Sequence, residues 1–262
     1  ALMADAMDNI VRSVQDFEEK LGEPLLAAVP LVDLKKQPGR SAAQAFANSE
    51  EHGFKEAIRT IRTGITLSTL DDPHEVIMVT SSLPGDGKST VAANIAIAFG
   101  QVGRTLLIDC DMRRPSMAEE FGLPKTQVGL AELLAGSAKL SEVVIERDEE
   151  GIHLICAGSV PPNPLEMLSS GAFSATIDKL QGLEDHVCID VVPTLLVSGA
   201  TVLSTIIDAI VYVLRANTTT IRQASQGLKA LRSVNGHVVG CVLNAVDLKK
   251  AAMYDEGYGY YG

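Results

Sequence analysis

The sequence predicts an α/β fold in which a mostly parallel central sheet carries helices on both faces. Short runs of apolar, mostly β-branched residues recur along the chain and alternate with longer segments that have helical spacing. Strands without polar alternation are typical of parallel sheets, because crossover helices bury both faces of such sheets. The runs predicted to form strands are 76–80, 105–108, 187–189, 209–214 and 238–243.

Composition and charge limit the classes of protein that this chain can represent. Its 262 residues are 46% hydrophobic, which is enough for a sizeable core. The net charge of −11 argues against non-specific attraction to nucleic acid or to an anionic membrane surface, so we expect no nucleic-acid partner. The four cysteines show no metal-ligand spacing, and we interpret them as buried thiols in a reducing cytoplasm. The sequence contains no run of about 18 apolar residues that could span a membrane.

The chain is predicted to divide into three segments. Residues 1–53 are expected to form a connector and mobile linker, residues 54–250 the folded domain, and residues 251–262 a flexible tail. A short amphipathic stretch with apolar residues at helical spacing lies within the connector and ends at Gly22.

The first helix of the predicted domain covers residues 54–67, with its apolar residues on one face. Glu56, Arg59 and Arg62 lie on a neighbouring face at spacings of three. These charges form either a solvated helix face, which is the usual case, or a contact between subunits. The sequence alone leaves both interpretations open.

A glycine-rich turn over residues 81–90 follows strand 76–80 and precedes a helix over residues 91–99. Gly85 and Gly87 allow the backbone to curl, so that successive N–H groups point at phosphate oxygens in front of the positive helix end. The order of strand, turn and helix therefore predicts a phosphate-binding loop, or P-loop.

Two side chains of this turn suit a magnesium-bound triphosphate. Lys88 offers a charge for the β and γ phosphates, and the Ser89 hydroxyl offers a ligand for Mg²⁺. The full pattern G-x-x-x-x-G-K-[ST] is not matched, because Ser82 stands in place of its first glycine. The alternative is a chance Gly-Lys-Ser turn, which the flanking strand and helix argue against.

Acidic residues follow two further predicted strands. Asp109 and Asp111 end strand 105–108, and Asp190 ends strand 187–189. Open α/β sheets bind ligands at the carboxyl ends of their strands, and carboxylates there suit Mg²⁺ and proton transfer. One such acid is often a helix N-cap, but the three elements in this order favour a nucleotide site.

Two polar side chains follow the last predicted strands. Arg215 follows strand 209–214, where it can face the nucleotide or the solvent. Asn244 follows strand 238–243, where it can bond a purine edge or act as an ordinary turn residue.

The chain ends in a glycine-spaced segment that is rich in tyrosine. Ordering its glycines costs backbone entropy, so the segment is not expected to fold by itself. It is either an adhesive disordered terminus or a tether that presents phenolic hydroxyls to an active site. The tyrosines concerned are Tyr254, Tyr258, Tyr260 and Tyr261.

Taken together, these motifs resemble the bacterial tyrosine kinases (BY-kinases) of capsule and exopolysaccharide synthesis. The resemblance rests on the P-loop over 82–90 (Walker A), the segment 107–115 (Walker A′), the prolines of 161–164 and the tyrosine tail. It covers nearly the whole chain. It implies an ATP-dependent autokinase with a P-loop NTPase fold, in which Mg²⁺ accompanies ATP and ADP.

The resemblance also implies roles for single residues. Lys88 and the loop residues would hold the β and γ phosphates, and Thr90 the α phosphate. Asp109 would act as base or orienter for the phenol, whereas Ser89, Asp111 and Asp190 would hold the metal. The residues expected to bind the nucleotide are Pro84, Gly85, Asp86, Gly87, Lys88, Ser89, Thr90, Arg215 and Asn244.

For assembly, the resemblance implies an octameric ring whose interface contains Glu56, Arg59 and Arg62. The tail of one subunit would then enter the site of its neighbour. The resemblance further implies a membrane portion of the same longer chain at the cytoplasmic face of the bacterial inner membrane, and a cognate tyrosine phosphatase as a partner.

The chain departs from the family pattern after Asp190, where the family has Asp-Thr-Pro-Pro and this chain has Val191 and Val192 before Pro193. Gly199 also replaces an acid. An ATP-binding scaffold without kinase activity therefore stays an alternative. The other alternative is a MinD/ParA-like positioning ATPase, but Leu83 occupies the position of the extra P-loop lysine of those proteins.

Overall fold

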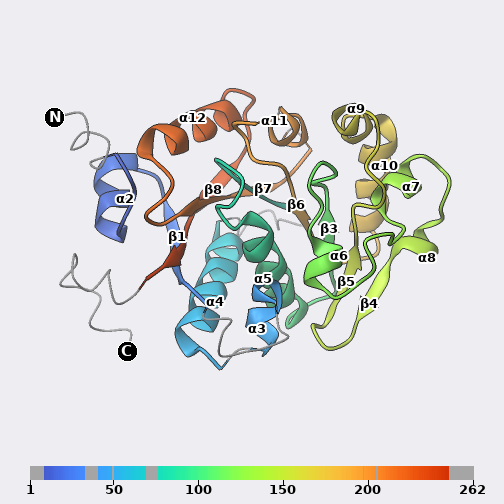
Figure 1. The fold of residues 1–262 in the computed structure, drawn as a ribbon, viewed down its shortest axis with the longest axis horizontal. Coiled ribbons are helices and arrows are strands. Elements are labelled where there is room, and N and C mark those ends of the chain that lie inside the picture. The colour runs from blue at the N-terminus through green and yellow to red at the C-terminus, as the bar shows by residue number, and fades with distance from the viewer. Residues whose placement is uncertain are drawn as a thin grey trace.

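The computed structural model describes residues 9–32, 41–48, 50–68, 76–196, 198–204 and 206–247. Within these residues, a sheet of eight strands has the order β1-β8-β7-β2-β6-β3-β5-β4 (Figure 1). Every pairing is parallel except that of β4 with β5. The predicted fold class is thereby confirmed. The strands are β1 (Leu25–Pro30), β2 (Val76–Ser81), β3 (Thr105–Asp109), β4 (Ile145–Arg147), β5 (Ile152–Ile155), β6 (His186–Asp190), β7 (Ala209–Arg215) and β8 (Val238–Val246).

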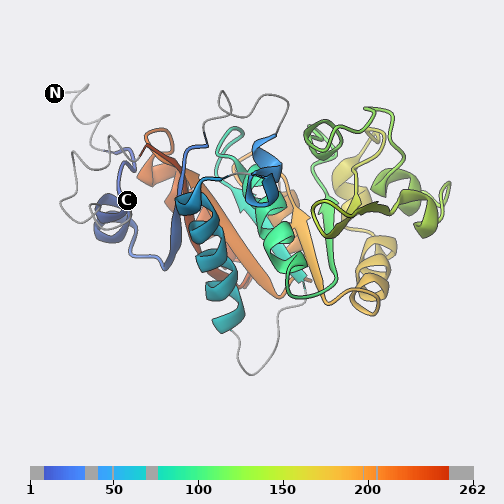
Figure 2. The same ribbon diagram turned by 90° about the horizontal axis from the view of Figure 1, so that it is seen from below.

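Helices cover both faces of the sheet, and a separate apolar core lies under each layer (Figures 1 and 2). One layer consists of η2 (Ala42–Gln44), α3 (Ala45–Asn48), α4 (His52–Leu67) and α5 (Lys88–Gly100). The opposite layer includes α2 (Val14–Leu21), α10 (Gly171–Gln181), α11 (Gly199–Leu203) and α12 (Ile221–Arg232). Because both faces are covered, all six residues of β2 are buried, as its uniformly apolar run predicts.

The α4 helix illustrates how apolar spacing determines packing. Phe54, Ile58, Ile61 and Ile65 are buried on one face. These residues recur at spacings of three and four, which is the period of a helix side that faces a core. The predicted helix over 54–67 is confirmed, and it begins two residues earlier, at His52.

The sequence predicts that the folded domain begins at residue 54, and the structure corrects this boundary. β1 adds an edge strand to the sheet by pairing with β8. Asn94 of α5 then holds the segment 41–48: its Oδ1 accepts from Phe46 N at 2.6 Å, and its Nδ2 donates to Ala42 O at 2.8 Å. The short apolar run Leu25–Pro30 lacks the β-branched richness of the other strands, which explains why the sequence did not indicate it.

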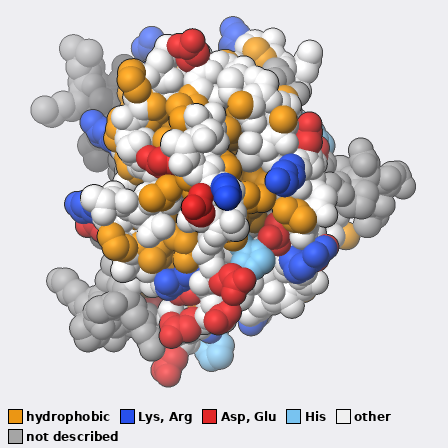
Figure 3. All heavy atoms as spheres, turned by 90° about the vertical axis from the view of Figure 1, so that its right-hand side faces the viewer, with side chains coloured by type: hydrophobic (Ala, Val, Ile, Leu, Met, Phe, Trp, Pro, Cys, Tyr) orange, Lys and Arg blue, Asp and Glu red, His pale blue; other side chains and the backbone are white. Residues whose placement is uncertain are grey.

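A group of short elements lies between β3 and β6 in the chain. It contains α6 (Met117–Glu120), α7 (Leu130–Leu134), α8 (Leu140–Val143), β4, β5 and α9 (Pro164–Leu168). These elements lie on the right-hand side of Figure 1. The surface on that side carries apolar side chains across its centre, and acidic side chains gather toward its lower edge (Figure 3). The sequence predicts neither β4 nor β5.

Among the residues that the structure describes, no helix has both the length and the apolar content that crossing a bilayer requires.

Candidate functional site

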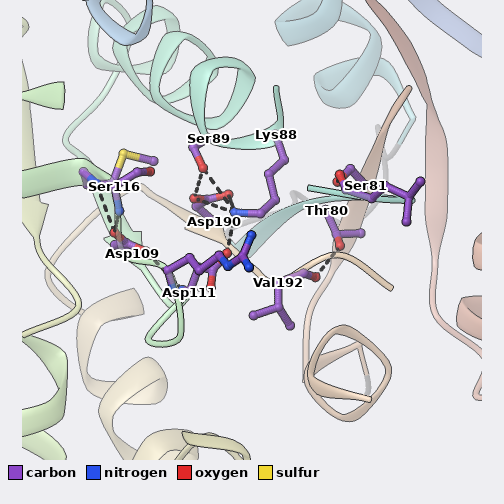
Figure 4. Close-up of polar contacts among 12 residues, drawn as sticks. Thr80, Ser81, Lys88, Ser89, Asp109, Asp111, Ser116, Asp190 and Val192 are labelled. Atoms are coloured by element: carbon purple, nitrogen blue, oxygen red, sulfur yellow. Dashed lines mark hydrogen bonds and ion pairs between the residues drawn. The ribbon is translucent and has the colours of Figure 1, made fainter. Parts of the chain in front are cut away.

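The candidate site lies where β2, β6 and β3 end side by side (Figure 4). The ammonium of Lys88 is 2.9 Å from Asp111 Oδ2 and 3.2 Å from both carboxylate oxygens of Asp190. The Ser89 hydroxyl donates to Asp190 Oδ2 at 2.6 Å. The structure thus brings together residues that are up to 102 positions apart in the chain.

The electrostatics of this cluster follow from burial and opposite charge. Lys88 is 8% exposed, and burial alone disfavours its charged form. The carboxylates of Asp190 and Asp111 outweigh that effect and raise the pKa of Lys88. Burial raises the pKa of Asp190, while the nearby Lys88 charge and the Ser89 hydroxyl oppose the rise. Lys88 therefore stays charged and compensates two carboxylates that would be costly to bury alone.

Asp109 lies beside this cluster but has other partners. Its Oδ1 accepts from Asp111 N at 3.0 Å, and its Oδ2 accepts from the N–H groups of Ser116 and Met117, each at 3.1 Å. The side chain is fully buried, and burial together with the Asp190 charge raises its pKa to about 7. The family resemblance implies that Asp109 is the base or orienter for the phenol, and this role stays a prediction. In the structure its carboxylate holds the segment that carries Asp111.

The P-loop backbone is arranged to receive an anion. Gly85 and Gly87 have φ values of 89° and 91°, which other residues rarely adopt. Gly87 is the N-cap of α5, makes no side-chain capping bond and precedes a first turn without acidic residues. The first N–H groups of this 13-residue helix are therefore available to a phosphate, which the helix dipole also favours.

Side chains behind the P-loop hold its shape. Asp86 accepts from Leu83 N at 2.9 Å and from the Thr219 hydroxyl at 2.8 Å. Arg215 donates to Gly85 O at 2.9 Å, and Asn244 donates to Asp86 O at 3.0 Å. Neither Arg215 nor Asn244 lines the cavity described below. In the structure these two residues support the loop, and their predicted contacts with the nucleotide stay predictions.

A cavity of about 800 Å³ opens in front of the P-loop. This volume lies within the usual range for small-molecule sites. The P-loop side includes Pro84, Gly85, Gly87, Lys88, Ser89 and Thr90. The other lining residues are Asp111, Arg113, Arg114, Ser116, Glu120, Val160, Pro161, Pro162, Pro164, Val192, Pro193 and Leu196. Arg113 and Arg114 are cavity residues that the sequence did not indicate, and both are exposed in the structure.

Two hydrogen bonds fix the turn after Asp190, which lacks the Thr-Pro pair of the family pattern. Thr80 donates to Val192 O at 2.9 Å (Figure 4), and Thr194 N donates to Ser81 O at 2.9 Å. The two departures from the pattern also lie together, because a Cβ on Gly199 would come within 2.9 Å of Val192 Cγ2. The absence of a side chain at residue 199 thus makes room for the branched Val192.

The other predicted site residues lie elsewhere. Glu56, Arg59 and Arg62 are on α4 and do not line the cavity. Arg59 lies 3.5 Å from Glu56 and over the Phe46 ring, and Arg62 donates to Ala98 O at 2.6 Å. The four tail tyrosines, Tyr254, Tyr258, Tyr260 and Tyr261, lie outside the described residues.

The residues at the site fit Mg²⁺ together with a nucleotide. Magnesium in such sites takes one or two protein oxygens and completes its shell with phosphate oxygens and water. Ser89, Asp111 and Asp190 supply oxygens around one point, at the mouth of a loop with free N–H donors. In the part of the chain that the structure describes, no cluster of three or more acidic, histidine or cysteine side chains could hold a metal ion by itself.

Comparison with known proteins first gives the class. A family model described as an AAA domain matches residues 74–239. The solved structure of the septum site-determining protein MinD of Pyrococcus horikoshii, complexed with Mg-ADP, matches with a TM-score of 0.55 and 22% identity. The match covers 65% of this chain and 70% of the MinD chain. At that identity the likeness concerns the fold alone. Fold and phosphate loop thus define a P-loop NTPase.

More similar proteins then give the family. Tyrosine-protein kinase YwqD of Bacillus subtilis is 36% identical, over 87% of this chain and 95% of its own length. The kinase domain of the Escherichia coli tyrosine kinase ETK has a TM-score of 0.80 and 27% identity, and the match covers 87% of this chain and 92% of that domain. Tyrosine-protein kinase Wzc of Salmonella typhimurium is 33% identical over 99% of this chain, which spans 37% of Wzc. The chain belongs to the bacterial tyrosine-protein kinases.

Proposed function

We propose that this chain is an ATP-dependent autokinase that phosphorylates the C-terminal tyrosines of a neighbouring copy. The observation that carries the proposal is that Lys88, Ser89 and Asp111 line the cavity, while the fully buried Asp190 contacts both Lys88 and Ser89. Such a set provides what phosphoryl transfer needs, namely positioning and neutralisation of phosphate charge.

The ion pairs of Lys88 suggest how the site would change when nucleotide binds. Phosphate oxygens would replace the carboxylates of Asp111 and Asp190 as partners of the Lys88 ammonium. Thr90 would bind the α phosphate. Asp111 and Asp190 would then be free to hold Mg²⁺ with Ser89, Asp190 acting through water. Held by these residues, the metal would supply neutralisation of phosphate charge.

The phenol oxygen of the acceptor would attack the γ phosphorus while the bond to the ADP oxygen breaks. The phenol proton would pass to an oxygen of the transferred phosphate, because Asp111 would be a ligand of the metal. Asp109 already accepts three backbone N–H bonds and would act through the segment that carries Asp111. A phenol with a pKa near 10 needs little help once it is aligned.

The tail tyrosines are the acceptors that the chain leaves available. The chain has five tyrosines, and Tyr212 is fully buried within β7. The remaining four are in the segment 251–262, where Asp255 and Glu256 accompany them. Arg113 and Arg114 line the cavity and are exposed, and their charge complements these acidic residues.

The proposal also includes an oligomeric assembly and a location at the membrane. A ring, octameric by family resemblance, would form through the α4 face that includes Glu56 and Arg59, both exposed, and Arg62. Phosphates on the tail of an already acidic chain would loosen this ring. The chain would act beside a membrane portion at the cytoplasmic face of the inner membrane, would be reset by a tyrosine phosphatase, and would regulate capsule or exopolysaccharide export.

Mass spectrometry after incubation with Mg-ATP tests this function. Phosphate on one or more of Tyr254, Tyr258, Tyr260 and Tyr261 is the expected result. ATP hydrolysis without phosphotyrosine would instead favour a positioning ATPase, which the MinD-like fold keeps as the second candidate. Neither reaction would favour an ATP-binding scaffold. Loss of high-mass oligomers after complete phosphorylation is the expected result for the ring.

A further inference from the structure

A buried tyrosine outside the cavity connects two segments of the site. Tyr212 is 0% exposed and lies in β7, opposite Thr80 in the register with β2. Its hydroxyl is 3.0 Å from Ser82 Oγ and 3.2 Å from Thr194 Oγ1. Ser82 opens the P-loop, and Thr194 closes the turn that follows Asp190. One hydroxyl thus lies between the two segments that carry the catalytic cluster.

The hydrogen bonds of this group have one consistent direction. The Thr194 hydroxyl donates its proton to Ser81 O at 3.1 Å, so its oxygen is left to accept from Tyr212. The Tyr212 oxygen then accepts from Ser82. Burial raises the pKa of Tyr212 to about 12, so the phenol stays protonated and keeps this donor role. Each of the three hydroxyl groups, of Ser82, Tyr212 and Thr194, therefore donates its proton in a hydrogen bond.

Helix α12 leaves room for this group. Gly227 lies within the helix, where glycine is normally unfavourable. A Cβ at that position would lie 1.8 Å from the Tyr212 hydroxyl oxygen and 2.5 Å from Thr194 Oγ1. A methyl group there would displace the phenol, so the glycine is explained by the hydroxyl cluster and not by the helix.

We infer that Tyr212 is a positioning residue, whose hydroxyl fixes the turn after Asp190 against the start of the P-loop. The contacts that depend on this spacing are those of Asp190 with Lys88 at 3.2 Å and with Ser89 at 2.6 Å. The inference also accounts for Ser82 at the position where the P-loop pattern has glycine, because glycine has no hydroxyl to donate. It rests on the proposed kinase function.

The test replaces single hydroxyl groups and leaves volumes nearly unchanged. Tyr212→Phe and Thr194→Val are expected to lower kcat for tail phosphorylation about tenfold, with KM for ATP changed less than about twofold, since a displaced catalytic group costs rate more than binding. Thr194→Ser keeps the hydroxyl and is expected to retain activity. The double variant Tyr212→Phe with Thr194→Val should lose no more than about the larger single effect, because both act through one connection.

A matched control separates positioning from general loss of stability. Thr105→Val removes another buried hydroxyl, which bonds to Gly103 O at 3.1 Å at the start of β3, away from the cavity. It is expected to lower the urea midpoint of unfolding by about as much as Tyr212→Phe while leaving kcat unchanged. An unchanged kcat in Tyr212→Phe, or an equal loss in Thr105→Val, would overturn the inference.

A second measurement does not depend on kinase activity. Displacement of Asp190 should raise the Mg²⁺ concentration that half-saturates ATP binding, by about threefold or more in Tyr212→Phe. If the unmodified chain transfers no phosphate to tyrosine, the proposed function fails, and this binding measurement still tests the role of Tyr212. An unchanged Mg²⁺ dependence in that variant would contradict that role.

Discussion

Asp109 and Asp190 lie opposite each other in the register of β3 and β6, yet they have different partners. Asp190 contacts the ammonium of Lys88, whereas Asp109 accepts three backbone N–H bonds. Two neighbouring buried carboxylates thus have different roles. One belongs to the charge cluster of the cavity, and the other fixes the loop that carries Asp111.

This division predicts different effects of two matched substitutions. Asp109→Asn puts an amide N–H₂ where a carboxylate oxygen accepts bonds, so it is expected to lower the free energy of unfolding by about 1–3 kcal/mol. Asp111→Asn should change that free energy less and lower kcat by about 10²-fold, because it weakens charge stabilisation at the cavity. Urea unfolding and tail phosphorylation measure the two effects. Equal stability losses in both variants would contradict the division.

Lys88→Met is expected to abolish phosphorylation and also to destabilise the fold. The change leaves Asp111 and Asp190 without their cation, and breaking a buried ion pair from one side costs about 3–5 kcal/mol. Lys125→Met is the control, because the ion pair of Lys125 with Glu119 is exposed and should contribute less than about 1 kcal/mol. Chemical unfolding of both variants gives the comparison, and equal losses would show that the buried cluster is not stabilised by Lys88.

The two P-loop glycines are predicted to respond differently to alanine. Both have positive φ, so each substitution strains the backbone. Around Gly85 the space is open, whereas a Cβ at Gly87 would lie 2.0 Å from Asn244 Nδ2. Gly85→Ala should therefore cost about 1 kcal/mol of stability, and Gly87→Ala more than that. Thermal unfolding with and without Mg-ATP measures the difference, and a smaller effect at residue 87 would refute the packing argument.

Asn94→Ala tests the corrected domain boundary. Asn94 bonds to Phe46 N, Ala42 O and Thr90 O, so it fastens the segment 41–48 to the helix that begins at the P-loop. Its loss leaves buried backbone groups unpaired, and we expect about 2–4 kcal/mol of destabilisation. Proteolysis should then cut near residues 41–48 before the sheet. If cleavage and stability stay unchanged, this segment is not part of the folded domain.

The sequence predicts the parts of this fold that depend on local pattern. Uniformly apolar runs indicate the central strands, and the glycine-rich turn between a strand and a helix indicates the phosphate loop. Strand-end acids point to one site because carboxyl ends of parallel strands share an edge. These features need no knowledge of which strands are neighbours.

What the sequence does not predict depends on contacts between distant segments. β1 is a strand because β8 offers it an edge, and its own residues do not require it. Asp109 and Arg215 end their strands as expected, whereas β8 continues to Val246 and so contains Asn244. Only the packed loops decide that the polar atoms of these three residues bond backbone groups. The role of Tyr212 likewise needs Thr194 and Gly227, which are adjacent to it only in the fold.

Mixing two marked variants tests the central claim most directly. One variant carries Lys88→Met and keeps its tail, and the other keeps Lys88 but has phenylalanine at Tyr254, Tyr258, Tyr260 and Tyr261. Neither should be phosphorylated alone with Mg-ATP. In the mixture, mass spectrometry is expected to find phosphate on the tail of the Lys88→Met chain. An unmodified tail in that mixture, while the unaltered protein phosphorylates itself, would contradict transfer between copies.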